Sequence, residues 1–280
     1  AKNKKNNNIV IKTLVFIILY FLIYYFLLTK NNIWNFFLYY GCVLLFGFLW
    51  GVLILAQHEF SHFYTNRSLN IFNKLLVNLL PILTGASNEQ FAILHAIDHH
   101  QTVGDSFETE FINKLKASLR IYKNDPCHRF TKYQHIYAYF YLLFFSIISI
   151  IIDNIIIIKN IQKIPIENII ILFIQKILFF CLIFIIPFFV LGKKWIFPLT
   201  IILIIVSIAI FIFEYYNHSD EQTVNKNKNK KMCWNNRIIN TTVNWDKSLI
   251  RNFFTFGLDK HVEHHFFPTL TSNNINYVTP

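Results

Sequence analysis

The sequence predicts an all-α integral membrane protein, with four transmembrane helices and interfacial helices under a cytosolic cap. Of its 280 residues, 54% are hydrophobic and only 15% are charged. The apolar residues gather in runs of about 20, the length at which a helix crosses a bilayer. A soluble protein with buried helices would need far more polar surface than these runs offer.

Charge supports the same class of protein. The formal net charge is +11, which on a membrane protein indicates basic loops that face the cytoplasm and anionic lipid headgroups. No nucleic-acid-binding motif accompanies this charge, so nucleic acid is not an expected partner. The four cysteines are scattered without a CxxC pair, which argues against a disulfide framework or a structural zinc site.

Four apolar runs predict the transmembrane helices. The first covers residues 9–28, is too long for the core of a signal peptide, and is followed by a second over 34–56. The third and fourth cover residues 169–190 and 195–216, separated by a tight turn. Each is long enough to span the hydrocarbon core as a helix.

Two other apolar segments are expected to lie along the membrane interface. Residues 69–83 are only moderately long, and Asn73, Lys74 and Asn78 interrupt them, which suits an interfacial or re-entrant segment. Residues 133–152 begin near His135 and end at Asp153. Because ionisable groups are costly inside a bilayer, this segment fits the interface better than a span.

Eight of the 11 histidines lie in three short windows, HEFSH from residue 58, HAIDHH from residue 95 and HVEHH from residue 261. Helix positions three or four apart share a face, so the histidines of each window are expected to point together. One such window could be structural, but three, each beside an apolar region, indicate a metal site. The candidate ligands are His58, His62, His95, His99, His100, His261, His264 and His265.

The number of histidines bears on which metal they would bind. Imidazole suits zinc, copper, iron and nickel. A zinc site takes three or four protein ligands, so eight histidines exceed one zinc and suit a pair of five- or six-coordinate irons. His218, at the exit of the fourth predicted span, is a ninth candidate ligand. His128 and His135 lie outside the windows and are interpreted as structural or interfacial.

Polar side chains are interleaved with these histidines. Such groups can accept the second ring N–H of a ligand and fix its orientation; ordinary solvated charge is the alternative interpretation. The candidates are Glu59, Asp98, Glu214, Asn217 and Glu263.

A shared metal site requires all three windows on one side of the membrane. The chain must then cross an even number of times between the second and third windows, where three apolar runs occur. Assigning residues 133–152 to the interface leaves two crossings there and places both termini on the same side. The cap would comprise residues 57–132 and 217–280 of a single domain, 1–280. The Lys-rich residues 226–231 and the basic N-terminus would then face the cytoplasm.

An oxygen-activating iron pair can attack an unactivated C–H bond. The helices beside it would supply a dry apolar channel that protects the oxidant from water. The expected substrate is therefore a lipid chain.

The order HxxxH, HxxxHH, HxxHH resembles the membrane fatty acid desaturases and their di-iron hydroxylase relatives. GASNEQFAILHAIDHHQTVGDSFETE resembles their second-box region, and RFTKYQHIYAYFYLLFF is similar to the segment that follows it in front-end (Δ5/Δ6-type) acyl desaturases. The block from INTTVNWDK to NINYVTP is similar to their C-terminal block, and the resemblance covers roughly residues 50–280. It implies that all nine histidines bind iron, and that a four-helix stem lies under a cytosolic cap.

The resemblance also implies a reaction and its partners. The reaction would be O2-dependent removal of two hydrogens from adjacent carbons of a fatty acyl chain, in an acyl-CoA or an acyl-lipid. It would need two Fe²⁺ ions, O2 as co-substrate and a separate electron donor, either a b-type cytochrome or a ferredoxin with its reductase, because no His-Pro-Gly-Gly of a fused cytochrome domain occurs. The membrane would be the endoplasmic reticulum in a eukaryote or the inner membrane in a bacterium, with the di-iron site on the cytoplasmic side.

Three positions depart from the front-end pattern. His261 stands where those enzymes commonly carry Gln, Glu59 where Asp is usual, and Ala96 where Asn often stands. The position of the double bond is therefore left open. A di-iron hydroxylase of alkanes, sphingolipids or carotenoids is the alternative, because it would use the same ligands. A membrane scaffold or lipid-binding protein whose metal site has lost activity is a third interpretation, and the nine filled ligand positions argue against it.

Overall fold

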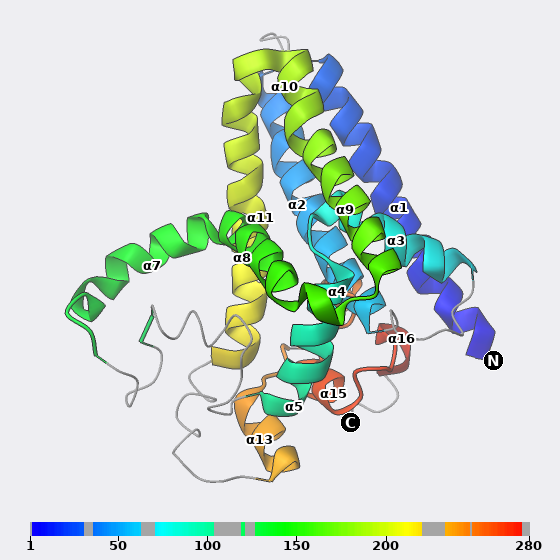
Figure 1. Ribbon diagram of the computed structural model, residues 1–280, viewed down its shortest axis with the longest axis vertical. Helices are drawn as coiled ribbons and strands as arrows, with labels where there is room; N and C mark the ends of the chain where they lie inside the picture. The colour runs from blue at the N-terminus through cyan, green and yellow to red at the C-terminus, as the bar shows by residue number, and fades with distance from the viewer. Residues whose placement is uncertain are drawn as a thin grey trace.

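The computed structural model describes residues 2–30, 36–62, 71–103, 119–120, 127–219, 233–246 and 248–275. Regular structure in this part of the chain is entirely helical, with no strand among the described residues. Long helical columns stand side by side, and the shorter helices gather at one end of them (Figure 1). This arrangement confirms the predicted all-α architecture.

The first two columns are α1 (Lys2–Thr29) and α2 (Phe36–Ser61), which pack against each other in opposite directions (Figure 1). The third column runs through α9 (Ile166–Phe180), the π-helical η5 (Cys181–Ile185) and α10 (Ile186–Leu191). The chain then reverses in a short 3-10 helix, η6 (Gly192–Trp195), and returns as the fourth column, α11 (Ile196–Ser219).

Four segments are long and apolar enough to cross a membrane: Asn8–Thr29, Phe36–Ser61, Phe145–Lys163 and Ile166–His218. The last has 53 residues and comprises two antiparallel columns, because Gly192 takes a positive φ of 59° at the reversal. The four predicted spans fall on the four columns.

The outer surface of the bundle is apolar. Phe37 and Phe189 are 90% and 85% exposed, and many other large apolar side chains face outward with them. Such a surface is unfavourable in water and is the surface that a helix presents to lipid. The four columns therefore form the part of a membrane protein that meets the hydrocarbon core.

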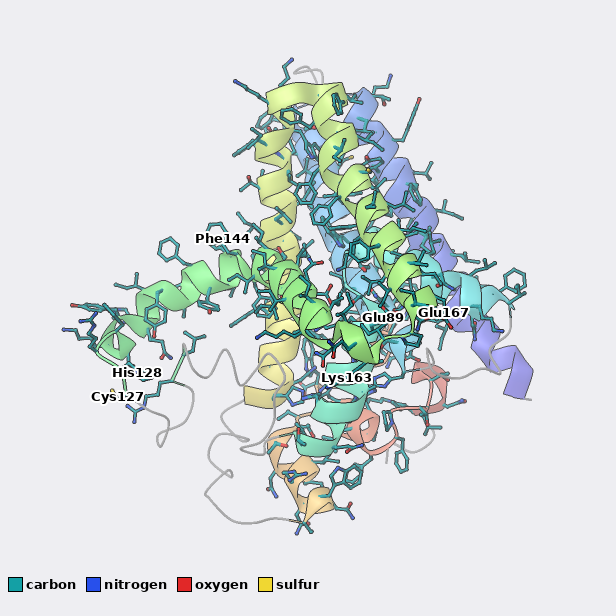
Figure 2. The ribbon with its side chains drawn as sticks, viewed as in Figure 1. Glu89, Cys127, His128, Phe144, Lys163 and Glu167 are labelled. Carbon is teal, nitrogen blue, oxygen red and sulfur yellow. The ribbon has the colours of Figure 1, made fainter. Side chains whose placement is uncertain are left out.

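The structure differs from the sequence prediction at residues 133–152. Two helices, α7 (Gln134–Leu143) and α8 (Phe145–Asn160), meet at a break at Phe144. Figure 2 shows Phe144 at this junction, and His128 at the outer tip of the arm that α7 forms, far from the bundle. None of the residues of α7 is buried, which fits an interfacial helix.

α8 does not end at Asp153 as the sequence predicted. It continues for two more turns because Asp153 is only 3% exposed and pairs with Lys176 of α9. The carboxylate is thus neutralised inside the protein. α8 is inclined to the four columns (Figure 1), and the 3-10 helix η4 (Ile161–Lys163) continues it to the end of the candidate span Phe145–Lys163.

The predicted interfacial segment 69–83 corresponds to α3 (Ile71–Thr84), which packs against α2 and α9. Gly85 follows with a φ of 79°, and a Cβ there would lie 2.5 Å from the ring of Phe179. Only glycine fits this turn without strain. The chain then enters three short helices, α4 (Asn88–Gln90), the π-helical η2 (Phe91–His99) and α5 (His100–Thr102).

The C-terminal helices cover the end of the bundle at which α2 and α11 finish (Figure 1). They are α13 (Trp234–Thr241), α14 (Leu249–Thr255), α15 (His261–Phe266) and α16 (Ser272–Ile275). α1 begins at this same end, as an even number of crossings requires. The four cysteines are free thiols.

Candidate metal centre

Nine histidines from four segments of the chain meet at the covered end of the bundle. Each is buried, with at most 9% of its surface exposed. α2 and the residue directly after it bring two of them, the η2–α5 segment three, the end of α11 one and α15 three. They are His58, His62, His95, His99, His100, His218, His261, His264 and His265.

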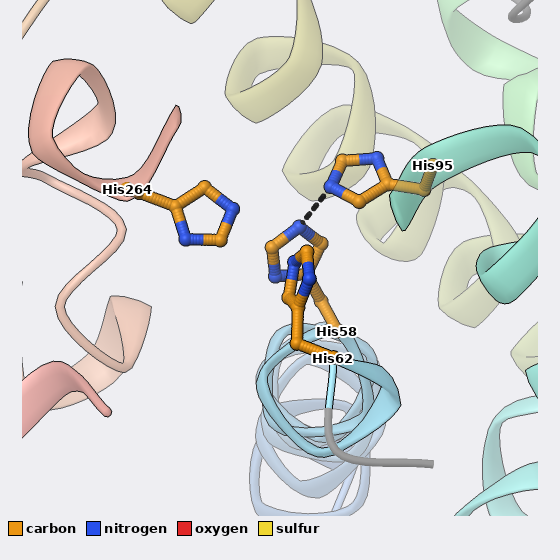
Figure 3. Close-up of side chains that lie close together, drawn as sticks. All are labelled: His58, His62, His95 and His264. Carbon is orange, nitrogen blue, oxygen red and sulfur yellow. Dashed lines mark hydrogen bonds between the residues drawn. The ribbon is translucent and has the colours of Figure 1, made fainter. Parts of the chain in front are cut away.

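The first group contains His58, His62, His95 and His264. One ring nitrogen from each lies within 4.8 Å of those of the other three. Figure 3 shows the four imidazoles gathered between α2, η2 and α15, with the Nε2 atoms of His58 and His95 2.5 Å apart. This group joins all three sequence windows.

The second group contains His99, His218, His261 and His265, again with one ring nitrogen of each within 4.8 Å of the others. The Nε2 atom of His218 is 3.1 Å from that of His99 and 2.8 Å from that of His261. The Nε2 atoms of His261 and His265 are 3.2 Å apart. His218, predicted from its place at the end of a span, thus lies among the histidines of the second and third windows.

His100 lies between the two groups. Its ring centroid is 4.8 Å from those of His62 and His264 and 4.4 Å from that of His265. Both of its ring nitrogens are buried, and neither makes a hydrogen bond within the described residues. Burying such groups without a partner is costly, so a ligand to these nitrogens would remove an energetic penalty.

The spacing of the ring nitrogens fits metal coordination. Neutral imidazoles whose lone pairs face each other repel unless a proton or a cation lies between them. With a metal–nitrogen distance of about 2.1 Å, ligands at right angles lie about 3.0 Å apart. The Nε2 separations of 2.8, 3.1 and 3.2 Å in the second group match this geometry.

The protonation state of the histidines is also that of metal ligands. Burial, and then the proximity of other imidazoles, lowers the pKa of five of them well below 6.5. These rings are therefore neutral at physiological pH, which is the form that binds a metal. The five are His95, His100, His261, His264 and His265.

A backbone carbonyl orients His218. Its Nδ1 lies 3.3 Å from the carbonyl oxygen of Thr241, and donation there leaves the Nε2 lone pair directed at the second group. The neighbouring Asn217 accepts a hydrogen bond from Trp245 Nε1 at 2.5 Å. The sequence could not identify Thr241, because a backbone acceptor leaves no signature in residue type.

The predicted polar partners have different roles. Glu263 accepts a hydrogen bond from Asn244 Nδ2 at 2.7 Å, and Asn244 Oδ1 accepts from Val262 N at 2.8 Å. Glu263 therefore helps to fix the segment after α13 against α15, a contact that the sequence did not predict. Glu59 is buried at the end of α2, and the side chains of Asp98 and Glu214 lie outside the described residues.

The sequence model of the fatty acid desaturase family matches residues 32–280. The chain belongs to the fatty acid desaturase family. The matched range contains all nine histidines and most of the described fold, and membership of this family implies an oxidoreductase. No curated protein and no solved structure matches the chain significantly. The match identifies the family as a whole, and the front-end resemblance stays a prediction.

Proposed function

We propose that this protein is an O2-dependent, non-haem di-iron desaturase that introduces a double bond into the acyl chain of an acyl-CoA or an acyl-lipid. One observation carries the proposal. Eight buried histidines form two adjacent groups of four, with His100 between them, at the end of an apolar helical bundle in a member of the fatty acid desaturase family.

Each group would hold one metal ion. His58, His62, His95 and His264 would bind one ion, and the group around His218 would bind the other. Nine nitrogen donors exceed the four that one zinc takes, and they suit two ions of higher coordination number. When bound, an iron pair supplies the O2-dependent oxidising power that an unactivated C–H bond demands.

The chain itself would prepare the site in three ways. It keeps the imidazoles neutral by burial, it directs His218 through the carbonyl of Thr241, and it excludes water, since none of the nine rings is more than 9% exposed. The apolar bundle that ends at the histidines would receive the acyl chain. Two adjacent carbons of the acyl chain each lose one hydrogen and become joined by a double bond. These two hydrogens, O2, two protons and two external electrons together give two molecules of water.

The two external electrons require a donor, which we infer to be a b-type cytochrome or a ferredoxin with its reductase. The histidines would face the cytoplasm, from the endoplasmic reticulum of a eukaryote or the inner membrane of a bacterium. The charge of the sequence supports this orientation, because Lys2, Lys4 and Lys5 open α1 at the histidine end, and the lysines of 226–231 fall in the sequence between α11 and α13.

Lipid profiling in a host that lacks its own desaturase tests the proposal. The full chain should give new double bonds, detected by mass spectrometry, and the purified protein should contain about two irons per chain. His264→Ala should abolish formation of the product and lower the iron content per chain. His128→Ala, at an exposed site far from the two histidine groups, should change neither quantity. New hydroxylated lipids would favour the hydroxylase function over the desaturase function. A purified protein that contains no metal and forms neither product would contradict both functions.

A further inference from the structure

A groove opens in the surface of the bundle at the end opposite to the histidines. It lies beside the reversal at η6, between the column that ends in α10 and the start of α11. Figure 1 shows α10 at the far end of the bundle from α13 and α15. All of the side chains that line the groove are apolar, and they include Phe184, Phe189, Trp195 and Leu199.

Trp195 gives the groove a fixed inner wall. Its side chain is only 1% exposed, and its Nε1 donates a hydrogen bond to the carbonyl oxygen of Ile183 at 3.0 Å. Ile183 belongs to the π-helical η5, a geometry that is frequent at functional sites. Because the indole N–H is already satisfied, the ring presents only its apolar surface to the groove.

The groove has the size and surroundings of a site for one alkyl chain. Its volume is about 280 Å³, below the roughly 300–1,000 Å³ of clefts that bind drug-sized ligands. Phe184 lies seven residues before the end of α10 at Leu191, so the groove reaches about 10 Å along the column. Phe188 and Phe189 are 51% and 85% exposed beside it. The groove is therefore open to the hydrocarbon of the bilayer.

Two lysines stand at the end of the groove. Lys193 and Lys194 are exposed in η6 and directly precede Trp195. Lys30, also exposed, follows α1 at the same end of the bundle. The sequence contains no Asp or Glu in residues 1–58 or 168–213, and these ranges include both turns at this end. Neither turn therefore supplies a carboxylate, and a lipid phosphate would complement the lysines.

The position of these lysines favours a bound lipid over a second copy of the chain. With the histidines on the cytoplasmic side, as proposed above, Lys193 and Lys194 face the side of the membrane on which basic residues are less frequent. An anionic headgroup would give them a partner there. Two chains joined through this groove would instead bring two basic turns together, which is unfavourable.

We propose that the groove between α10 and α11 binds one acyl chain of an anionic phospholipid, and that Lys193 and Lys194 bind its phosphate. The site lies at the opposite end of the bundle from the histidines, so this lipid is distinct from the acyl substrate. The inference goes beyond the proposed function and requires no iron. The bound lipid would hold the two columns together at their reversal.

Lipid retention by the full-length protein in detergent tests the headgroup contact. Phosphatidylglycerol and phosphatidylcholine with identical acyl chains are the probes, and native mass spectrometry counts the lipids bound. Wild-type protein should retain one phosphatidylglycerol in preference to phosphatidylcholine. The double variant Lys193→Gln with Lys194→Gln should bind phosphatidylglycerol about tenfold more weakly. The matched control is Lys159→Gln with Lys163→Gln, which removes two exposed lysines elsewhere and should bind as the wild type does.

Filling the groove tests the acyl-chain contact. Leu199→Trp should weaken retention of both lipids, whereas Ile18→Trp, on a side chain of α1 that is 58% exposed outside the groove, should not. Phosphatidylglycerol with brominated acyl chains should quench the fluorescence of Trp195, and Trp195→Phe should remove that part of the quenching. The unfolding midpoint in lipid-free detergent and the iron content of the lysine variants should match the wild type, which separates loss of lipid from loss of fold.

Three results would overturn the inference. The first is undiminished retention of phosphatidylglycerol by the Lys193 and Lys194 double variant. The second is equal binding of phosphatidylglycerol and phosphatidylcholine by the wild type. The third is a dimer that Leu199→Trp dissociates, which would assign the groove to a second copy of the chain. Failure of the proposed function is distinguishable, because a protein without iron or without product would still retain the lipid.

Discussion

Lys176 and Asp153 form a buried ion pair between α9 and α8, beside the turn that leads to the second histidine window. Lys176 Nζ also donates to the carbonyl oxygen of Gly85 at 2.6 Å, and Ser87 Oγ donates to Asp153 Oδ1 at 2.7 Å. The pair thus holds both ends of the turn from Gly85 to Ser87. Because η2 starts soon after this turn, the ion pair helps to set where its histidines lie.

Removing one member of this ion pair should destabilise the protein far more than removing both. Lys176→Met or Asp153→Asn leaves a polar or charged group buried without its partner, and each should lower the free energy of unfolding by about 3–5 kcal/mol. The double variant Asp153→Leu with Lys176→Met should recover part of this loss. Thermal unfolding and iron content measured on the same samples check both expectations.

Ser146→Ala is the matched control for the ion pair. Ser146 ties α8 to α11 through Ser207 and the carbonyl of Leu203, so its loss should cost about 1 kcal/mol without loss of iron. Single ion-pair variants that are no less stable than Ser146→Ala, with full iron content, would contradict a positioning role.

The division of the histidines into two groups predicts how metal is lost. His264→Ala should release the ion of the first group, and His261→Ala that of the second, so each variant should retain about one of two metal ions. Each should also be inactive if both ions are needed. Metal analysis of the purified variants, with His128→Ala as a reference, measures this. Complete retention of metal in either variant would show that the residue is not a ligand.

Burial of neutral histidines makes the stability of the metal-free protein depend on pH. The pKa values of His95, His100, His261, His264 and His265 are lowered in the folded state, so the unfolded chain binds more protons below pH 6.5. Above pH 6.5 these groups should therefore leave the free energy of unfolding unchanged. At lower pH each group should reduce the free energy of unfolding by up to about 1.4 kcal/mol per pH unit.

Unfolding midpoints of chelator-treated protein between neutral and mildly acidic pH test this dependence. Bound metal competes with protons for the same nitrogens, so the metal-loaded protein should keep its stability to lower pH. A metal-free protein that gains stability on acidification would contradict the burial of neutral imidazoles.

Gly85→Ala should strongly destabilise the protein. A Cβ would meet the Phe179 ring at 2.5 Å, and the φ of 79° disfavours any L side chain. The backbone alone should cost about 1–3 kcal/mol, and the clash adds to it. Gly41→Ala is the control, because a Cβ there has no atom within 4 Å and alanine favours the helix by up to about 1 kcal/mol. Equal unfolding midpoints for the two variants would contradict this account.

The sequence by itself determined the membrane columns and the components of the metal site. Runs of apolar residues specify helices of membrane length, because a bilayer leaves few other ways to satisfy the backbone. The windows around His58, His95 and His261 indicated a metal site from residue type and spacing alone. A shared site required them at one end of the bundle, and the structure brings them together there.

The tertiary structure decided how the histidines are shared. The sequence predicted that His95 and His99 point together, as would His261 and His264, yet each pair is divided between the two groups. A helix that lies between the two histidine groups can contribute ligands to both. The group that each imidazole joins depends on where the helix lies relative to them. The π-helical geometry of η2 also alters the angle between successive side chains.

The partners of buried charges were likewise decided in three dimensions. Asp153 and Lys176 stand out in the sequence as ionisable residues within apolar segments, a signal that such residues have a special role. Nothing in their spacing shows that they pair with each other, because α8 and α9 meet only when the chain folds. Local sequence sets which helices form and which residues can bind a metal, whereas contacts between distant segments set which of those residues meet.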